Sequence, residues 1–321
     1  MTAFSVIGAG VAGLTVAAEL LTRGAEVTVI DRAEGPGGAQ CSWWAGGMLA
    51  PWCERESADR AVVDLGRCAA DWWAEKTQVI RNGTLVIAPA RDRTELKRFA
   101  RRTDHFDQIG AERIAALEPD LAGRFHEALF FPEEAHLTPR QALADVARNI
   151  QEAGATTIRW RTVEPLPGTT IIDCRGFAAS RDLPSLRGVK GEMLVIRTDD
   201  VTLSRPVRLL HPRHPLYIVP RGDGIFMLGA TMIESADRSR ITVRSMLEVL
   251  GAAYALHPAF AEAEIVEIGA DVRPAFPDNL PRAERHGDRI HVNGLYRHGF
   301  LLAPAMARQA ADLAMEAMAC P

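Results

Sequence analysis

The first thirty-two residues constrain the fold of this chain more than any other stretch. Residues 4–7 have the pattern of a short buried strand, residues 8–13 match G-x-G-x-x-G, and residues 14–22 have the apolar spacing of a helix. A second strand is expected over residues 26–30, directly before Asp31. A strand, turn, helix and strand in this order, with an acidic residue at this distance, predict a Rossmann-type dinucleotide site.

Each glycine of the turn has a separate task in such a site. Gly8 permits the tight turn, Gly10 lets the backbone approach a pyrophosphate, and Gly13 lets helix and strand pack closely. The free N–H groups and the dipole at the helix N-terminus favour a phosphate there. The carboxylate of Asp31 can accept hydrogen bonds from a ribose, so the turn is interpreted as a ligand site.

The composition is typical of a globular enzyme. The 321 residues are 47% hydrophobic and 24% charged, which fits two domains or one large one. A net charge of −4 gives no electrostatic reason to expect nucleic acid or an anionic membrane as a partner. No apolar run approaches the roughly 18 residues of a membrane span. The first strand begins too near Met1 for a signal peptide, and the five cysteines form no C-x-x-C pair, so a cytoplasmic protein is expected.

Hydrophobic periodicity predicts the remaining elements. Helices are expected over residues 57–77, 94–109, 111–117, 138–154, 242–257 and 304–318. Strands are expected over residues 84–88, 156–160, 169–174, 191–197, 207–210, 216–220, 224–228, 264–269 and 290–292. The glycine-rich segments 35–40 and 41–51 predict backbone lying against a ligand, because glycine permits close approach.

The short strands between residues 191 and 228, with Gly222-Asp223-Gly224 as a hairpin turn, predict a second sheet of antiparallel strands. The expected fold class is therefore α/β with mixed α+β character. A Rossmann-type cofactor-binding domain is expected from residues 1–78, 135–185 and 268–321. A mostly antiparallel, inserted substrate-binding domain is expected from residues 79–134 and 186–267.

Four further segments carry a family resemblance: residues 42–51, which end in Gly-Met-Leu-Ala-Pro; residues 217–221 followed by 229–232; residues 271–279; and residues 294–305. Their order and content resemble the D-amino-acid-oxidase family of FAD-dependent oxidoreductases over almost the whole chain. The glycine oxidases, which supply dehydroglycine for the thiazole ring of thiamine, are the most similar branch. The resemblance implies non-covalently bound FAD rather than NAD, and a substrate sheet lying over the flavin.

The resemblance also implies a role for each matching position. The pyrophosphate would be cradled by Gly8, Gly10, Val11, Ala12 and Gly13. Asp31 and Arg32 would hold the adenosine ribose, and Val163 would meet the adenine through its backbone. The flavin would be contacted by Cys41, Ser42, Gly46, Gly47, Met48, Gly176, Arg297, His298, Gly299, Phe300, Leu301 and Leu302. Trp43 and Trp44 replace smaller residues common in the family, so the resemblance does not determine which residues form the wall of the site.

Four residues would act on the substrate. Arg273 matches the carboxylate-binding arginine of the family, and its planar guanidinium can hold both oxygens. Tyr217 would donate a second hydrogen bond, Met232 would close the pocket over the α-carbon, and Arg297 would lie near the flavin edge. The implied reaction is oxidative deamination of glycine or another small amine by hydride transfer to flavin N5, with O2 reduced to H2O2. No dedicated base is needed if the amine binds neutral.

Other readings remain open at this point. The chain could be a sarcosine or D-amino-acid oxidase, or a dehydrogenase that gives electrons to a quinone. A non-catalytic flavin-binding protein is a further alternative, although Arg273, Tyr217 and Arg297 together favour an enzyme. Expected partners are the small substrate, O2, other copies of the chain and thiazole synthase. No metal is expected, because His211 and His214 have no third ligand nearby.

Overall fold

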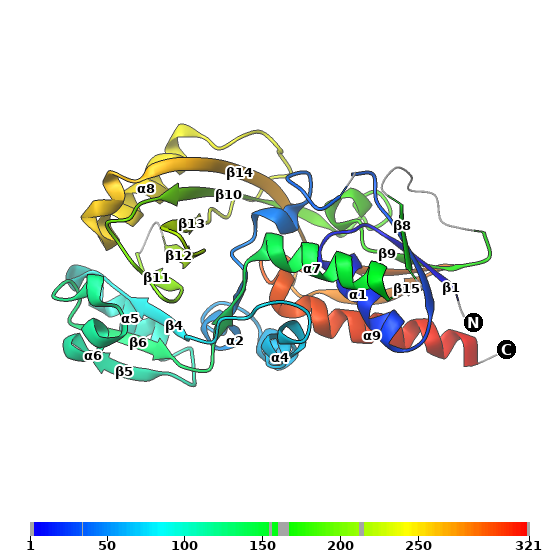
Figure 1. Cartoon of the computed structure of the whole chain (residues 1–321), viewed down its shortest axis with the longest axis horizontal. Helices are drawn as coiled ribbons and strands as arrows, with labels where there is room; N and C mark the ends of the chain where they lie inside the picture. The colour runs from blue at the N-terminus through cyan, green and yellow to red at the C-terminus, as the bar shows by residue number, and fades with distance from the viewer. Residues whose placement is uncertain (1–2, 34, 154–155, 160–166, 212–214, 320–321) are drawn as a thin grey trace.

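A computed structural model describes residues 3–33, 35–153, 156–159, 167–211 and 215–319. Two large sheets lie toward opposite ends of an elongated molecule, with both chain termini at the end that carries the smaller one (Figure 1). A two-stranded ribbon, β3 (Met48–Leu49) with β7 (Ala135–His136), is the third sheet. Among the described residues no helix is long and apolar enough to cross a lipid bilayer.

The six-stranded sheet has the order β15-β16-β9-β1-β2-β8. Five strands run parallel: β1 (Ala3–Ile7), β2 (Glu26–Ile30), β8 (Thr156–Arg159), β9 (Thr170–Asp173) and β16 (Arg289–Asn293). The edge strand β15 (Arg282–His286) is antiparallel to β16. The predicted Rossmann-type arrangement around β1 and β2 is confirmed, with β15 as an unpredicted addition.

Three long helices pack with the six-stranded sheet: α1 (Val11–Thr22), α7 (Pro139–Glu152) and α9 (Gly299–Ala319). Helix α9 begins five residues before the predicted start, so Pro304 lies inside it. Proline has no N–H to donate to the carbonyl four residues earlier. The indole Nε1–H of Trp73 donates to that carbonyl, of Phe300, at 2.7 Å instead. A tertiary contact therefore satisfies the acceptor that Pro304 leaves free.

The eight-stranded sheet has the order β14-β10-β13-β12-β11-β4-β6-β5. Every neighbouring pair is antiparallel except β11 with β4, which confirms the predicted mostly antiparallel sheet. Its strands are β4 (Thr84–Ile87), β5 (Asp107–Gly110), β6 (Glu127–Phe131), β10 (Arg187–Arg197), β11 (Val207–Leu209), β12 (Leu216–Pro220), β13 (Ile225–Gly229) and β14 (Glu264–Ala275). Helix α8 (Val243–Leu256) packs with this sheet through an apolar cluster.

Two further helix predictions were wrong in extent. The helix expected over residues 57–77 is two helices, α3 (Arg60–Gly66) and α4 (Ala69–Ala74), preceded by the short α2 (Pro51–Glu54). Gly66 lies so close to Leu301 of α9 that an added Cβ would be 2.8 Å from the leucine side chain. The helix is interrupted at residues 67–68, directly after Gly66.

The helix expected over residues 94–109 ends much earlier. It is α5 (Arg93–Ala100), and residues 107–110 form the edge strand β5, followed by α6 (Ala111–Leu117). His105 has a positive φ of 60°, a left-handed conformation that no α-helix can contain. Pairing of β5 with β6, a strand that was not predicted, fixes the extended conformation. Strand β14 also exceeds its prediction, because it continues along β10 to Ala275.

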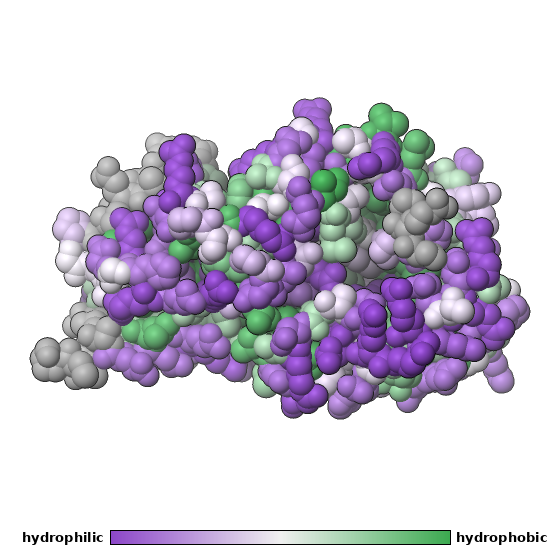
Figure 2. Space-filling model, turned by 180° about the vertical axis from the view of Figure 1, so that it is seen from behind, coloured by the Kyte–Doolittle hydropathy of each residue, from purple (hydrophilic) through white to green (hydrophobic). Residues whose placement is uncertain are grey.

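The rear face of the molecule is mainly hydrophilic, and a few apolar side chains gather near the end that carries the larger sheet (Figure 2). The large exposed apolar residues belong chiefly to α8 and to the first half of β14. They include Val243, Leu247, Tyr254, Ile265, Val266 and Ile268.

Candidate active site

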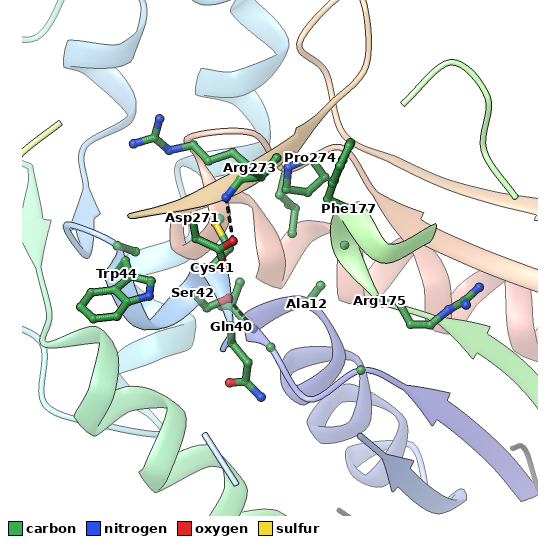
Figure 3. A pocket seen from close by; sticks show the side chains of 18 of the residues that line it. Ala12, Gln40, Cys41, Ser42, Trp44, Arg175, Phe177, Asp271, Arg273 and Pro274 are labelled. Carbon is green, nitrogen blue, oxygen red and sulfur yellow. Dashed lines mark hydrogen bonds between the residues drawn. The ribbon is translucent and has the colours of Figure 1, made fainter. Parts of the chain in front are cut away.

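A cavity of about 580 Å3 lies where the carboxyl ends of β1, β2 and β9 meet strands of the larger sheet (Figure 3). Ligands of open α/β sheets bind at this end of the strands. Strands β10, β12 and β14 of the larger sheet supply the opposite lining. Of the residues predicted from the sequence, it is lined by Gly8, Gly10, Val11, Ala12, Asp31, Arg32, Cys41, Ser42, Gly46, Gly176, Tyr217, Arg273, Arg297, Gly299 and Phe300.

The glycine turn between β1 and α1 is tightly packed on the protein side. Gly8 has a φ of 102°, and an added Cβ on Gly13 would lie 1.7 Å from the Gly8 carbonyl oxygen. Around Gly10, in contrast, an added Cβ would meet only the Ser42 hydroxyl, at 3.3 Å. The Val11 N–H donates to that hydroxyl at 3.0 Å. No acidic residue occupies the first turn of α1, so no carboxylate of the helix itself offsets its positive end at the cavity.

Asp31 is fixed at the end of β2 by two backbone groups. The N–H of Ala9 donates to its Oδ2 at 2.7 Å, and the N–H of Ala33 donates to its Oδ1 at 2.8 Å. Each carboxylate oxygen retains acceptor capacity beyond these bonds. The side chain therefore lines the cavity in a fixed orientation.

Gln40 is a lining residue that sequence reasoning did not assign. Its side-chain oxygen and nitrogen are both buried, and neither has a hydrogen-bond partner among the described residues. Buried amides normally have partners. The unpartnered amide, the N-terminal end of α1 and the fixed carboxylate form a donor and acceptor set that fits the phosphates and ribose of a dinucleotide.

Arg273 and Tyr217 line the same cavity from two strands of the larger sheet. The Nη1 of Arg273 donates to the Thr231 carbonyl at 2.9 Å, and most of its five donors have no acceptor among the described residues. The ring of Tyr217 lies between two glycines, where an added Cβ would be 2.9 Å away on Gly46 and 2.7 Å away on Gly229. Burial raises the pKa of Tyr217, although Arg273 opposes the shift, so the phenol remains a donor at neutral pH.

The backbone beside Tyr217 is held by Arg221. This buried guanidinium donates to the carbonyls of Leu137 at 2.8 Å, Ala45 at 3.2 Å and Gly46 at 2.8 Å. Burial lowers the pKa of Arg221 to about 10, so it stays charged at neutral pH. Arg221 belongs to residues 217–221, one of the segments that carry the family resemblance. No pattern in the sequence indicated its contacts with the three carbonyls.

The segment 41–44 forms another wall of the cavity. Burial raises the pKa of Cys41 to about 12, with Asp271 adding to the shift. Trp44 lines the cavity, whereas Trp43 does not. The Cζ of Arg140 lies over both indole rings, 4.6 Å from the ring centre of Trp43 and 5.4 Å from that of Trp44. Figure 3 shows Trp44 at the side of the cavity next to Cys41 and Asp271. Trp44 and Asp271 are further lining residues without a predicted role.

Residues 297–302, which include the first turn of α9, divide into two groups. Arg297, Gly299 and Phe300 line the cavity, and the Nη2 of Arg297 lies 2.6 Å from the Ser57 hydroxyl and 2.9 Å from Glu54. The other three residues, His298, Leu301 and Leu302, are buried.

Some predicted residues lie outside the cavity lining: Gly13, Gly47, Met48, Met232, His298, Leu301 and Leu302. Gly47 has a φ of 70° and packs against the Leu137 carbonyl. Met232 is 51% exposed, with its sulfur 3.4 Å from the Tyr296 hydroxyl and 3.6 Å from Nη1 of Arg297. Val163, predicted to meet the adenine, and His214 lie outside the described residues.

A comparison with protein families matches this arrangement. The family model for DAO, the FAD-dependent oxidoreductases, covers residues 4–313. The chain belongs to this family. FAD is accordingly the dinucleotide that the DAO-family chain uses, and the glycine turn, Asp31 and Gln40 are residues that fit it.

Individual proteins that are similar to this chain agree with the family assignment. A protein of Rhizobium etli, named as the thiamine biosynthesis oxidoreductase ThiO, is 59% identical over 95% of this chain and 94% of its own length. Glycine oxidase of Pseudomonas aeruginosa is 26% identical over 96% of this chain and 93% of its own length. The crystal structure of glycine oxidase from Geobacillus kaustophilus has a TM-score of 0.82 at 21% identity, covering 98% of this chain and 95% of that one, which establishes the shared fold.

Proposed function

We propose that this FAD-dependent oxidoreductase oxidises glycine to its imine, dehydroglycine, with O2 as the electron acceptor and H2O2 as a product. The observation that carries the proposal is that Arg273 and Tyr217 line the same cavity as the dinucleotide turn. A guanidinium and a phenol can together bind a small carboxylate. A cofactor-binding protein without a substrate would need neither group there.

The chain's own residues position the substrate. Arg273 binds the carboxylate through its free N–H groups, and Tyr217 donates a further hydrogen bond. Arg297 lies at the cavity wall, and the sulfur of Met232 lies 3.6 Å from its Nη1. From there Met232 would close the pocket over the α-carbon. When bound, FAD supplies the redox step by accepting a hydride from the α-carbon and returning the electrons to O2. The amine lone pair compensates the hydride loss, so positioning replaces a dedicated base.

We assign cofactor binding to residues 1–78, 135–185 and 268–321, and substrate binding to residues 79–134 and 186–267. The membership of the two sheets supports this division, since the larger sheet contains β4 to β6 and β10 to β13. Strand β14 starts in the larger sheet and ends at the cavity, so it connects the two parts.

The ThiO relative supports a role in making the thiazole ring of thiamine, with thiazole synthase as the consumer of the imine. An imine of this kind hydrolyses in water, so a nearby consumer would limit its loss. We further assign the chain to the cytoplasm and to a homo-oligomer; its described cysteines are free thiols, which fits a reducing compartment.

The test is a peroxide assay on the holoenzyme with glycine, sarcosine and D-alanine. We expect H2O2 release with the largest kcat/KM for glycine. Arg273→Met should raise KM for glycine strongly, while the surface change Arg244→Met on α8 should not. A larger kcat/KM for sarcosine or D-alanine would reassign the substrate. Turnover with a quinone but not with O2 would make the protein a dehydrogenase.

A further inference from the structure

Glu54, the last residue of α2, is a buried carboxylate with partners from two distant parts of the chain. Its Oε2 lies 2.9 Å from Nη2 of Arg297 and 2.8 Å from Nε2 of His298, both directly before α9. Its Oε1 accepts a hydrogen bond from Nη2 of Arg208 on β11. One side chain therefore links the start of α9 to the larger sheet.

Two of the three partners of Glu54, Arg297 and Arg208, adjoin the cavity. Arg297 lines it directly. Arg208 is the direct cross-strand partner of Tyr217 in the β11–β12 pair, so the two side chains share one face of the sheet. The carboxylate thus lies behind the site, between the proposed flavin side and the proposed substrate side.

The hydrogen-bond pattern leaves Glu54 as the charged acceptor of the cluster. Burial alone would raise its pKa, but Arg297 and Arg208 hold that pKa well below the usual range. Burial lowers the pKa of His298, so its ring is neutral, and its Nε2 must carry the proton that faces Glu54 at 2.8 Å. The Nε of Arg297, 3.2 Å from the same nitrogen, cannot then donate to it. Arg297 is held instead by Glu54 and Ser57.

We propose that Glu54 is a positioning residue of the active site: it fixes Arg297 and the start of α9 against β11, and its negative charge offsets Arg208 and Arg297 beside the flavin. The effect on glycine turnover rests on the proposed function. The effect on the bound flavin does not, because charge near the ring sets how readily it is reduced whatever the substrate.

A matched control exists in the larger sheet. Glu118 is also buried, and its Oε1 pairs with Nε of Arg205 at 2.7 Å and with the Ser204 hydroxyl at 2.7 Å. Neither Glu118 nor Arg205 lines the cavity. Replacing either glutamate by glutamine leaves an arginine without its buried counter-charge, so both changes lower stability by the same mechanism. Only one of them is next to the site.

The experiment compares wild type, Glu54→Gln and Glu118→Gln as holoenzymes. The readouts are the midpoint potential of bound FAD and kcat/KM for glycine. Glu54→Gln should shift the potential to more positive values, because it removes a negative charge, and should lower kcat/KM about tenfold through misplacement of Arg297. Glu118→Gln should lower the melting temperature and leave both readouts unchanged. Glu54→Asp, which keeps the charge, should restore the potential.

Arg208→Met gives a second, independent arm. It removes a positive charge from the same cluster, so it should shift the potential in the opposite direction, to more negative values. A purely structural role of Glu54 would not produce opposite shifts. A wild-type potential in both Glu54→Gln and Arg208→Met would overturn the proposal, and so would an equal shift in Glu118→Gln. Failure of wild type to oxidise glycine would overturn the proposed substrate, and the potentials would still decide the role of Glu54.

Discussion

The guanidinium of Arg273 lies directly over Gly191 on the neighbouring strand. An added Cβ at Gly191 would be 2.2 Å from Cζ of Arg273, closer than any carbon contact allows. Both residues line the cavity, Arg273 from β14 and Gly191 from β10. The absence of a side chain at position 191 is therefore what gives the proposed carboxylate anchor its place.

The first prediction concerns this contact. Gly191→Ala should raise KM for glycine about tenfold with a smaller effect on kcat, because the flexible guanidinium must move while the cofactor side is untouched. Steady-state kinetics on the holoenzyme measure it. Gly251→Ala in α8 is the control, since an added Cβ there meets nothing within 4 Å. An unchanged KM in Gly191→Ala would remove Arg273 as the anchor.

The second prediction concerns the cavity wall at Trp44. Its Nε1 donates to the Gly38 carbonyl at 2.9 Å, and β14 passes so close that an added Cβ at Gly269 would lie 2.1 Å from the ring. Trp44→Ala should weaken FAD binding about tenfold by opening this wall. Trp43→Ala also loses a contact with Arg140 but does not open the cavity. Fluorescence titration of the apoproteins with FAD compares them, and equal affinities would contradict the role of Trp44.

Local patterns predicted the elements whose structure is decided locally. The turn from Gly8 to Gly13 and its flanking elements follow from glycine chemistry and apolar spacing within about thirty residues. Strand β5 could not be predicted in the same way, because its extended conformation depends on pairing with β6 and on the left-handed His105. Helix α9 contains Pro304, and a tryptophan from another helix, distant in the sequence, satisfies the carbonyl that the proline leaves free.

The residues of the candidate site divide in the same way, into those that a local sequence pattern indicates and those that it does not. Candidate roles could be proposed for motif residues such as Gly10, Asp31 and Arg273, because their neighbours in sequence carry the pattern. Arg221 and Glu54 could not, since their importance lies in contacts with carbonyls and arginines far away in the chain. A buried charge has no sequence signature of its own, because charged residues are mostly exposed.

The third prediction concerns stability against pH at His136. Burial lowers the pKa of this side chain to about 4, with Arg221 adding to the shift, and neither ring nitrogen has a partner among the described residues. The unfolded chain binds the proton near pH 6.5, so it gains protons that the folded protein does not. The contribution of His136 to the free energy of unfolding is therefore full above pH 6.5. As the pH falls toward 4, the free energy of unfolding decreases by about 3 kcal/mol through this group.

The measurement is the free energy of unfolding in urea at pH 7 and pH 4.5 for wild type and His136→Gln. The difference between the two proteins isolates His136 from the other groups that titrate in this range. Wild type should lose more stability than the variant on acidification. Parallel losses would show that His136 does not resist protonation in the folded state.

The fourth prediction concerns how FAD is attached. With a pKa of about 12, Cys41 is a thiol at neutral pH, and burial also holds the pKa of Cys174 well above its usual value. Thiolates, not thiols, are the nucleophiles, so neither cysteine should bond to the flavin. Denaturation should release all FAD through an ultrafilter, and iodoacetamide at pH 7 should spare Cys41 in the folded protein. Flavin retained on the denatured chain would contradict the assignment.

The visible absorption spectrum of the purified holoenzyme, recorded without oxygen before and after addition of glycine, tests the central claim most directly. The account predicts oxidised-flavin bands that bleach with glycine, bleach more slowly with α-deuterated glycine, and return with release of H2O2 when air is admitted. A flavin spectrum that glycine leaves unchanged, in a protein that chemical reductants bleach, would contradict the claim that this chain oxidises glycine.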